Sequence, residues 1–229
     1  MNNVDVIILT RSNTEKAIRM TKRTILSLDD SEKDYEFNVH LVESGVDFKH
    51  QYANIVSNYI LPKENFNYNR FVNHAIPYLK SDWVVISNND VGYERGWFSE
   101  IMKVHSERPD ITSFSPKDPL LYMKYYDWHF IQSDSTHFES YSVTEAVMGW
   151  CLVIRKDSFD KIAPLDELFD MYYQDNDYAM CIQREGIKHA LCRYSIACHL
   201  QTATITRLDE EKINKMKADE LKFRTKWNQ

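Results

Sequence analysis

The stretch SDWVVISNNDV, residues 81–91, decides the fold of this 229-residue chain. Residues 83–86 form a short apolar run rich in β-branched side chains, which is typical of a strand covered on both faces in an α/β sheet. The run ends in Ser-Asn-Asn-Asp, residues 87–90, which favour a turn. Because ligands of open α/β sheets bind beyond the carboxyl ends of central strands, Asp90 is placed to meet a ligand or a metal ion. A simple Asn-rich turn is the alternative interpretation.

The composition is that of an ordinary globular protein. Hydrophobic residues make up 43% and charged residues 27%, and the length suits one domain. The net charge of −6 gives no overall basic surface for nucleic acid, although a local basic patch stays open. The cysteines form no Cys-x-x-Cys pair, and no segment is apolar and long enough for a signal peptide or a membrane span. We therefore expect free thiols and a cytoplasmic location, in the host cytoplasm if the chain is phage-encoded.

The order of predicted elements gives the fold class. A strand over residues 4–10, a helix over 15–28 and a strand over 37–42 form a βαβ unit, which requires parallel strands and a right-handed crossover. Further elements follow to residue 199: strands over 59–61, 83–86, 111–114, 148–155 and 188–198, and helices up to 79 and over 96–107, 157–162 and 178–185. We expect an α/β fold with a mixed, mainly parallel central sheet flanked by helices, over residues 1–205. Residues 206–229 are predicted to form an amphipathic helix packed on that domain.

Three features of the sequence suggest ligand binding without defining the ligand. The chain has five glycines and no Gly-rich phosphate loop, so side chains and a metal ion must hold any nucleotide. Arg70 offers a fork that matches phosphate oxygens, and Glu43 can accept hydrogen bonds from a base or ribose or simply be a solvated turn residue. The aromatic segment 116–141 suits a binding loop as well as packing over the sheet edge.

Seven motifs follow one another along the chain. They are TRS (10–12), Glu43, FNYN (66–69) with NHA (73–75), SNND (87–90), the strand from Gly149 to Lys156, DE (166–167) with QDND (174–177), and His199. In this order they resemble the inverting, nucleotide-sugar-dependent glycosyltransferases of the GT-A fold, a family that includes many rhamnosyl- and glucosyltransferases. The resemblance spans residues 4–199. The chain departs from the family pattern at Asn88, where a stricter Asp-x-Asp has a carboxylate, and at Gln174, which replaces a glutamate.

The resemblance implies a Rossmann-like GT-A domain that binds a nucleotide-diphosphate sugar, with UDP the expected nucleotide. It implies that Asp90 and His199 share Mn²⁺ or Mg²⁺ with diphosphate oxygens, and that Asp175 is the catalytic base. The implied donor-binding residues are Thr10, Arg11, Glu43, Asn67, Arg70, Asn73, Asn88, Asn89 and Asp90. The implied acceptor-binding residues are Trp150, Asp166, Glu167 and Asp177.

The residue types suit this chemistry. A divalent ion and donors such as arginine neutralise the charge that develops on a diphosphate leaving group. Oxygen and imidazole ligands suit Mg²⁺ or Mn²⁺, and a histidine slightly favours Mn²⁺. Inversion requires a carboxylate that takes the proton of the acceptor hydroxyl while its oxygen attacks the anomeric carbon.

The acceptor and the alternatives stay open at this point. The acceptor is a saccharide, a lipid-linked or protein hydroxyl, or, in a phage-type enzyme, a hydroxymethylated pyrimidine in DNA. The basic residues that suit DNA lie in the tail: Lys212, Lys215, Lys217, Lys222 and Lys226. A non-catalytic sugar-nucleotide-binding module is the second class of function. A nucleotidyltransferase of similar fold is the third, and it would need a triphosphate cradle.

Overall fold

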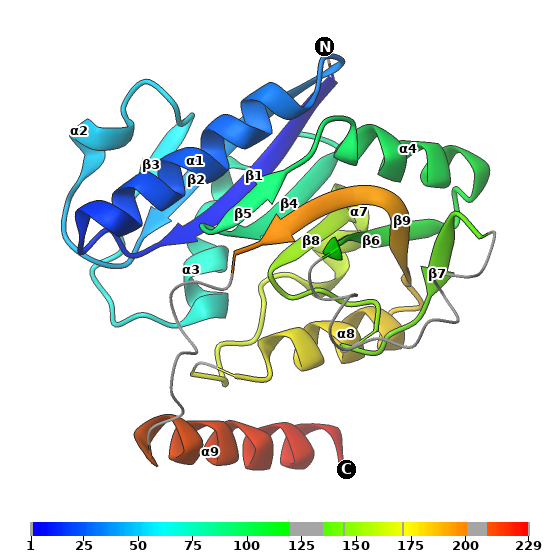
Figure 1. Ribbon diagram of the computed structural model, residues 1–229. Helices are drawn as coiled ribbons and strands as arrows, with labels where there is room; N and C mark the ends of the chain where they lie inside the picture. Colours follow the sequence, from blue (N-terminus) through cyan, green and yellow to red (C-terminus); the bar gives the residue numbers. More distant parts are fainter. Residues whose placement is uncertain (1, 120–134, 144, 171, 201–209, 229) are drawn as a thin grey trace.

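The computed structural model describes residues 2–119, 135–143, 145–170, 172–200 and 210–228 (Figure 1). Its strands are β1 (Asn2–Thr10), β2 (Tyr35–Glu43), β3 (Asn58–Ile60), β4 (Trp83–Asn88), β5 (Val91–Tyr93), β6 (Ile111–Lys117), β7 (His137–Glu139), β8 (Cys151–Arg155) and β9 (Lys188–His199). Its helices are α1 (Glu15–Ser31), α2 (Lys49–Tyr52), α3 (Tyr68–Ala75), the 3₁₀ helix η1 (Ile76–Tyr78), α4 (Trp97–Glu107), α7 (Lys156–Ile162), α8 (Gln174–Arg184) and α9 (Glu210–Trp227).

The strands form one mixed sheet in the order β3-β2-β1-β4-β8-β6-β9-β5, with β7 paired to β9. β3, β2, β1 and β4 run parallel, β8 is antiparallel to β4 and β6, and β6 is parallel to β9. The predicted mixed, mainly parallel sheet is therefore confirmed, including the opening βαβ unit.

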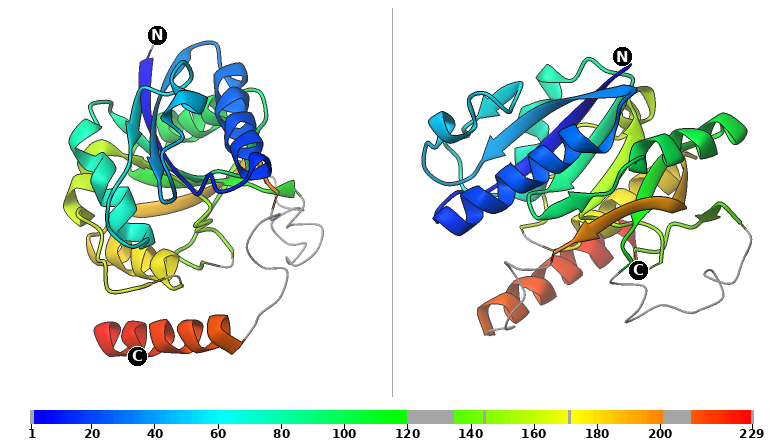
Figure 2. Two further views of the ribbon diagram at one scale, coloured as in Figure 1. Left: turned by 90° about the vertical axis from the view of Figure 1, so that its left-hand side faces the viewer. Right: turned by 45° about the horizontal axis from the view of Figure 1, so that its top comes forward.

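Helices cover both faces of this sheet, as the two views of Figure 2 show. Side chains alternate along β1, so that Val6 and Ile8 join one core cluster and Ile7 joins another. The first cluster includes buried residues of α1 and α4, and the second includes those of α3, α7 and α8. In β4, Val85 faces the first cluster while Val84 and Ile86 face the second, each at most 1% exposed. The apolar run of β4 is thus explained by burial on both sides.

The register of the strands sets the position of the polar turns. Thr10 pairs with Glu43, and Leu9 pairs with Asn88, so β1, β2 and β4 end at the same edge. β5 follows directly and pairs antiparallel with β9, which sets Val91 opposite His199. The polar residues that follow these strands are therefore neighbours in space.

Some boundaries differ from the sequence prediction. α8 begins at Gln174, four residues before the predicted start, because Tyr173 turns the chain in the left-handed region, at φ 66°, and a polar first turn follows. β5 and β7, of three residues each, were not predicted. Residues 120–134 of the predicted aromatic loop lie outside the described residues.

The C-terminal helix α9 lies beside α8 (Figures 1 and 2). Phe223 is buried, with its ring centroid 5.3 Å from that of Tyr173 and 6.4 Å from that of Phe169. The predicted domain boundary at residues 205–206 lies outside the described residues. None of the helices in the described ranges combines the length and the apolar character that crossing a membrane requires.

A buried carboxylate joins the strands at the opposite end of the sheet. Asp5 of β1 contacts His40 of β2 at 3.1 Å, and it accepts hydrogen bonds from the amides of Lys80 and Ser81 before β4. Burial alone would raise the pKa of Asp5, but these hydrogen bonds outweigh it and lower the pKa from 3.8 to about 2.

We predict that Asp5 makes folding stability pH-dependent in acid. Because the pKa of Asp5 is lower in the folded state than its value of 3.8 in the unfolded state, the Asp5 carboxylate stabilises the fold fully above pH 3.8. This stabilisation is lost as the pH falls through about 2. Between pH 5 and pH 2.5, the advantage of the wild type over Asp5→Asn in urea unfolding should shrink by about 1.5 kcal/mol. Asp29→Asn, at an exposed position of α1, is the control, and parallel pH curves for wild type and Asp5→Asn would contradict the prediction.

Candidate functional site

The predicted metal ligands meet at the edge of the sheet. Asp90, which is 6% exposed, lies in the turn between β4 and β5, and His199 ends β9. Their Oδ1 and Nε2 atoms are 3.1 Å apart, and the Asn88 Nδ2 atom lies 3.2 Å from the same Nε2. The turn after β4 and the end of β9 thus bring together Asp90 and His199, two motif residues that lie far apart in the sequence.

This triangle suits a cation. The Nε2 atom of His199 can donate to Asp90 if it carries a proton, or accept from Asn88 if it does not, but it cannot do both. A divalent ion between carboxylate and imidazole satisfies the charge of Asp90 and the lone pair of His199 together, and this donor set fits Mn²⁺. Within the ranges that the structure describes, no group of three or more His, Cys, Asp or Glu residues forms a complete metal site. Further ligands would have to come from the substrate or from water.

The turn that carries Asp90 is held by residues that the sequence analysis did not identify. The hydroxyl of Thr24 on α1 donates to the carbonyl of Asn89 at 2.9 Å and accepts from the amide of Val91 at 3.1 Å. The carboxylate of Asp118, which is 1% exposed, accepts from the amide of His199 at 3.2 Å. Thr24 lies within a helix and Asp118 just after a strand, and neither belongs to a motif. Their partners could be identified only from the fold.

The residues at the end of β1 belong to the same network. The Asn89 amide donates to the hydroxyls of Thr10, at 3.1 Å, and Thr21, at 2.9 Å. These two hydroxyls are 2.8 Å apart. Thr10 and Asn89 thus join β1, α1 and the turn after β4.

Glu43 closes the neighbouring turn. Its carboxylate is fully buried and accepts from the amides of Ser12, at 3.0 Å and 3.2 Å, and Gly45, at 2.7 Å. A Cβ atom at position 45 would lie 3.0 Å from Glu43 Oε1, so glycine leaves room for this contact. Arg11 is exposed beside this turn. Donor recognition by Glu43 and Arg11 stays a prediction.

The polar residues of α3 hold a loop. Asn67 donates to the carbonyls of Glu167 and Phe169 at 3.0 Å and 2.7 Å, while Asn73 exchanges two hydrogen bonds with the backbone of Leu165. Arg70 donates to the Glu167 carboxylate at 2.7 Å. Asn67, Arg70 and Asn73 thus hold the loop of residues 165–169 in place. Their predicted contact with a nucleotide-sugar donor stays a prediction.

The predicted base, Asp175, is half-buried beside a glycine. A Cβ atom at position 149 would lie 2.8 Å from the Cβ of Asp175, so only glycine allows this close approach. Burial raises the pKa of Asp175, although its Oδ1 accepts from the Asn176 amide at 2.9 Å. The Tyr68 hydroxyl donates to the carbonyl of Gly149 at 3.3 Å, and burial raises the Tyr68 pKa. Asp175 therefore holds its proton more readily than an ordinary aspartate.

Trp150 lies between the predicted metal ligand His199, which its ring contacts, and the glycine that contacts the predicted base. Its indole stacks on the ring of His199, with a centroid distance of 5.4 Å and an interplanar angle of 9°, and it follows Gly149 directly. Trp150 is 8% exposed, and among the described residues its Nε1 has no hydrogen-bond partner. The same holds for the buried Nε2 of Gln174, the residue before Asp175. Buried N–H groups normally have hydrogen-bond partners. The unpaired N–H groups of Trp150 and Gln174 are therefore available to acceptor oxygens of a ligand.

The remaining acidic candidates are already paired. Lys226 of α9 lies 2.7 Å from carboxylate oxygens of both Asp166 and Asp177. The Trp227 indole donates to Asp177 at 2.8 Å. Asp166 and Asp177 therefore anchor α9, and their role in acceptor binding stays a prediction.

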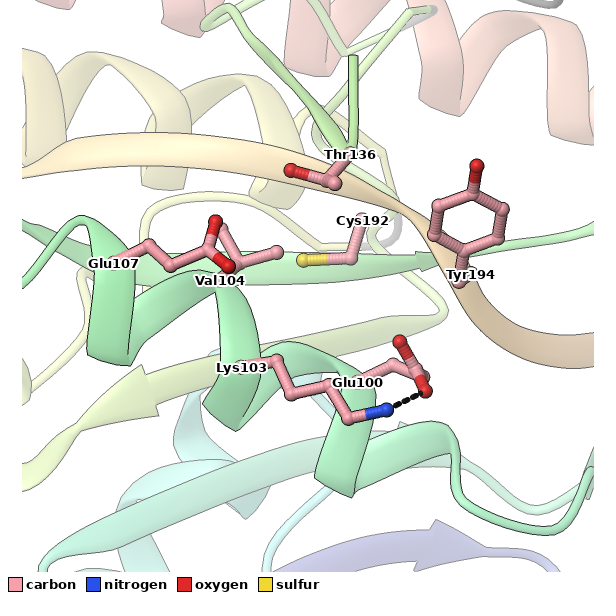
Figure 3. A pocket seen from close by; sticks show the side chains of 7 residues that line it. All are labelled: Glu100, Lys103, Val104, Glu107, Thr136, Cys192 and Tyr194. Atoms are coloured by element: carbon pink, nitrogen blue, oxygen red, sulfur yellow. Dashed lines mark hydrogen bonds and ion pairs between the residues drawn. The ribbon is translucent and has the colours of Figure 1, made fainter. Parts of the chain in front are cut away.

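A small pocket lies away from these residues, between α4 and β9 (Figure 3). Figure 3 shows the thiol of Cys192 pointing toward Val104, with Lys103 bound to Glu100 nearby. Burial raises the pKa of the Cys192 thiol, which makes it a poor nucleophile. The pocket contains no predicted site residue.

Comparison with known proteins places the fold. No protein-family model and no curated protein matches the sequence. GalNAc-T7, solved with UDP, GalNAc and Mn²⁺, superposes with a TM-score of 0.68 at 10% identity over 93% of this chain and 47% of its own. The mannosyltransferase PcManGT from Pyrobaculum calidifontis, solved with GDP-Man and Mn²⁺, gives 0.64 at 12% identity over 87% of this chain and 57% of its own. The chain thus spans about half the length of these proteins and has the GT-A fold that they share.

Proposed function

We propose that this protein is a metal-dependent, inverting glycosyltransferase that moves a sugar from a nucleotide-diphosphate sugar, with UDP the expected nucleotide, to an acceptor hydroxyl. One observation carries the proposal: on a GT-A sheet, the Gly149–Trp150 dipeptide contacts both groups, with Trp150 stacked on His199 of the Asp90–His199 pair and Gly149 against the half-buried Asp175. Both structural neighbours were solved with Mn²⁺ and a nucleotide or nucleotide sugar, which supports the same ligand class here.

The donor half is the edge at which the parallel strands end. Asp90 and His199 would hold Mn²⁺ or Mg²⁺, which when bound neutralises charge on the diphosphate leaving group. Arg11 is exposed at this edge, where its fork can reach phosphate oxygens. Glu43, Thr10 and Asn89 keep the two turns in place for the nucleoside.

Asp175 serves the acceptor half as the base. The acceptor oxygen bonds to the anomeric carbon on one face of the sugar while the bond to the diphosphate oxygen breaks on the other. The acceptor proton moves to Asp175, and the bonding electrons leave with the diphosphate. Burial favours the protonated form of Asp175, which makes its carboxylate a stronger base than an exposed aspartate.

The acceptor that fits best is a neutral saccharide hydroxyl. The unpaired N–H groups of Trp150 and Gln174 suit hydroxyl oxygens of a sugar. Lys222 and Lys226, which the DNA hypothesis needs for phosphates, are held by aspartates at 2.7–2.9 Å. Activity on a DNA acceptor is therefore the weaker alternative.

We predict a nucleotide-dependent gain in thermal stability. A ligand that binds only the folded state stabilises it by about 2.7 kcal/mol at a hundredfold excess over Kd. UDP, GDP, UDP-GalNAc and GDP-mannose should be compared with and without Mn²⁺ by thermal shift, with Ca²⁺ as the control ion. At least one should raise the melting temperature by several degrees only when Mn²⁺ is present. Equal curves for all four, with and without Mn²⁺, would contradict the proposed function.

Asp90→Ala should remove Mn²⁺-dependent donor binding while the fold remains. The change deletes one of the two protein ligands, and metal-free donor affinity should stay at its low level. Calorimetric titration of donor with Mn²⁺ measures the effect. Asp82→Ala alters an exposed carboxylate at the other end of the same strand and should bind like wild type. Undiminished donor affinity in Asp90→Ala would rule out the proposed metal site.

Asp175→Asn should bind donor and Mn²⁺ normally but turn over about 10²–10⁴ times more slowly, the usual cost of losing a general base. Release of nucleotide from the donor, with water or a saccharide panel as acceptor, measures this. Glu185→Gln, at the other end of α8, contacts Arg184 and should leave the rate unchanged. If Asp175→Asn works at the wild-type rate, the base lies elsewhere.

A further inference from the structure

Helix α9 contributes one carboxylate that is completely buried. Asp219 is 0% exposed, and its oxygens accept from the backbone amides of Asp170, at 3.2 Å, and Tyr172, at 3.1 Å. Lys222, one turn along α9, lies 2.9 Å from an Asp219 oxygen and from a carboxylate oxygen of Asp170. A buried carboxylate is costly unless amides and a cation satisfy it, and both are present here.

The amides that Asp219 binds lead directly to the proposed base. Tyr173 follows with φ 66°, a conformation that is strained for a tyrosine and persists only where the surroundings hold it. α8 then starts at Gln174, and Asp175 lies in its first turn. The direction in which Asp175 points therefore depends on a strained link.

α9 also holds the chain on the other side of Asp175. Lys226 and Trp227 bind the carboxylate of Asp177, which is 2% exposed, and Lys226 reaches Asp166 as well. The ring of Phe223 lies against that of Tyr173. The contacts of α9 described here all fall on residues 166–184, whereas the Asp90–His199 pair is held by α1, β5 and Asp118.

We infer that Asp219 is a positioning residue for proton transfer: through the amides of Asp170 and Tyr172 it fixes the strained turn that orients Asp175. This inference rests on the proposed role of Asp175 as the base. α9 is then part of the catalytic scaffold and acts on the transfer step, while donor and metal binding depend on the sheet edge. A misplacement of about 1 Å in a reacting group can cost about 10²-fold in rate, so a modest loosening of this turn is sufficient.

The test uses the full chain with Asp219→Ala and the milder Asp219→Asn, which keeps one acceptor oxygen. Glu220→Gln is the matched control, because this neighbouring carboxylate binds Arg224 within α9. Hydrogen exchange of the segment 168–178, without any ligand, reports the anchoring. Nucleotide release from UDP-GalNAc or GDP-mannose with Mn²⁺, whichever binds, gives kcat and KM.

Asp219→Ala should exchange its 170 and 172 amides at least about tenfold faster and lower kcat about 10²-fold, with donor KM within about twofold of wild type. Asp219→Asn should show smaller changes in the same direction, and Glu220→Gln none. A purely structural role would lower the melting temperature and leave kcat of the folded protein unchanged, which overturns the inference. Unchanged exchange in Asp219→Ala overturns it too. If the exchange effect appears but the wild type releases no nucleotide from either donor, the anchoring is supported and the proposed function fails.

Discussion

The parallel pairing of β1 with both β2 and β4 is the constraint on which the site depends. It sets Thr10 beside Glu43 and Leu9 beside Asn88, so that two polar turns emerge at one edge. A slip of one residue would turn every side chain of a strand to the other face, and β1 is buried on both faces from Val4 to Thr10. Core packing therefore fixes the position of the edge at which the proposed site lies to within one residue.

Carboxylates that are buried need partners, and the partners of the carboxylates in this protein differ. Glu43 and Asp219 bind backbone amides, and Asp177 binds Lys226 and Trp227. Asp175 lies against Gly149 and receives the amide of Asn176, and burial is the largest influence on its pKa. A carboxyl whose pKa is raised by burial can exchange a proton more readily near neutral pH than an ordinary aspartate.

Much of the fold could be predicted from local patterns, because β4 is a continuous apolar run bounded by polar residues, and β2 and α1 show clear periods in their apolar residues. The meeting of Asp90 with His199 followed only from motif order, and the structure places these side chains 3.1 Å apart. Thr24, Asp118 and Asp219 were missed, since each acts on backbone groups far away in the sequence and none belongs to a motif. The left-handed Tyr173 was missed for a similar reason: tyrosine does not favour that conformation, and the ring of Phe223 that packs against it comes from α9.

The two halves of the site are held by different kinds of structure, and their sensitivity to change should differ accordingly. The proposed donor edge is made of strand ends whose positions are fixed by a core on both faces of the sheet. The segment with Asp175 is a loop and a helix start, which depend on side chains from α3 and α9. Loops that carry function tolerate exchange better than the sheet that supports them. Under the proposed function, changes of acceptor are therefore expected to fall in the Asp175 segment more often than at the edge where β1, β2 and β4 end.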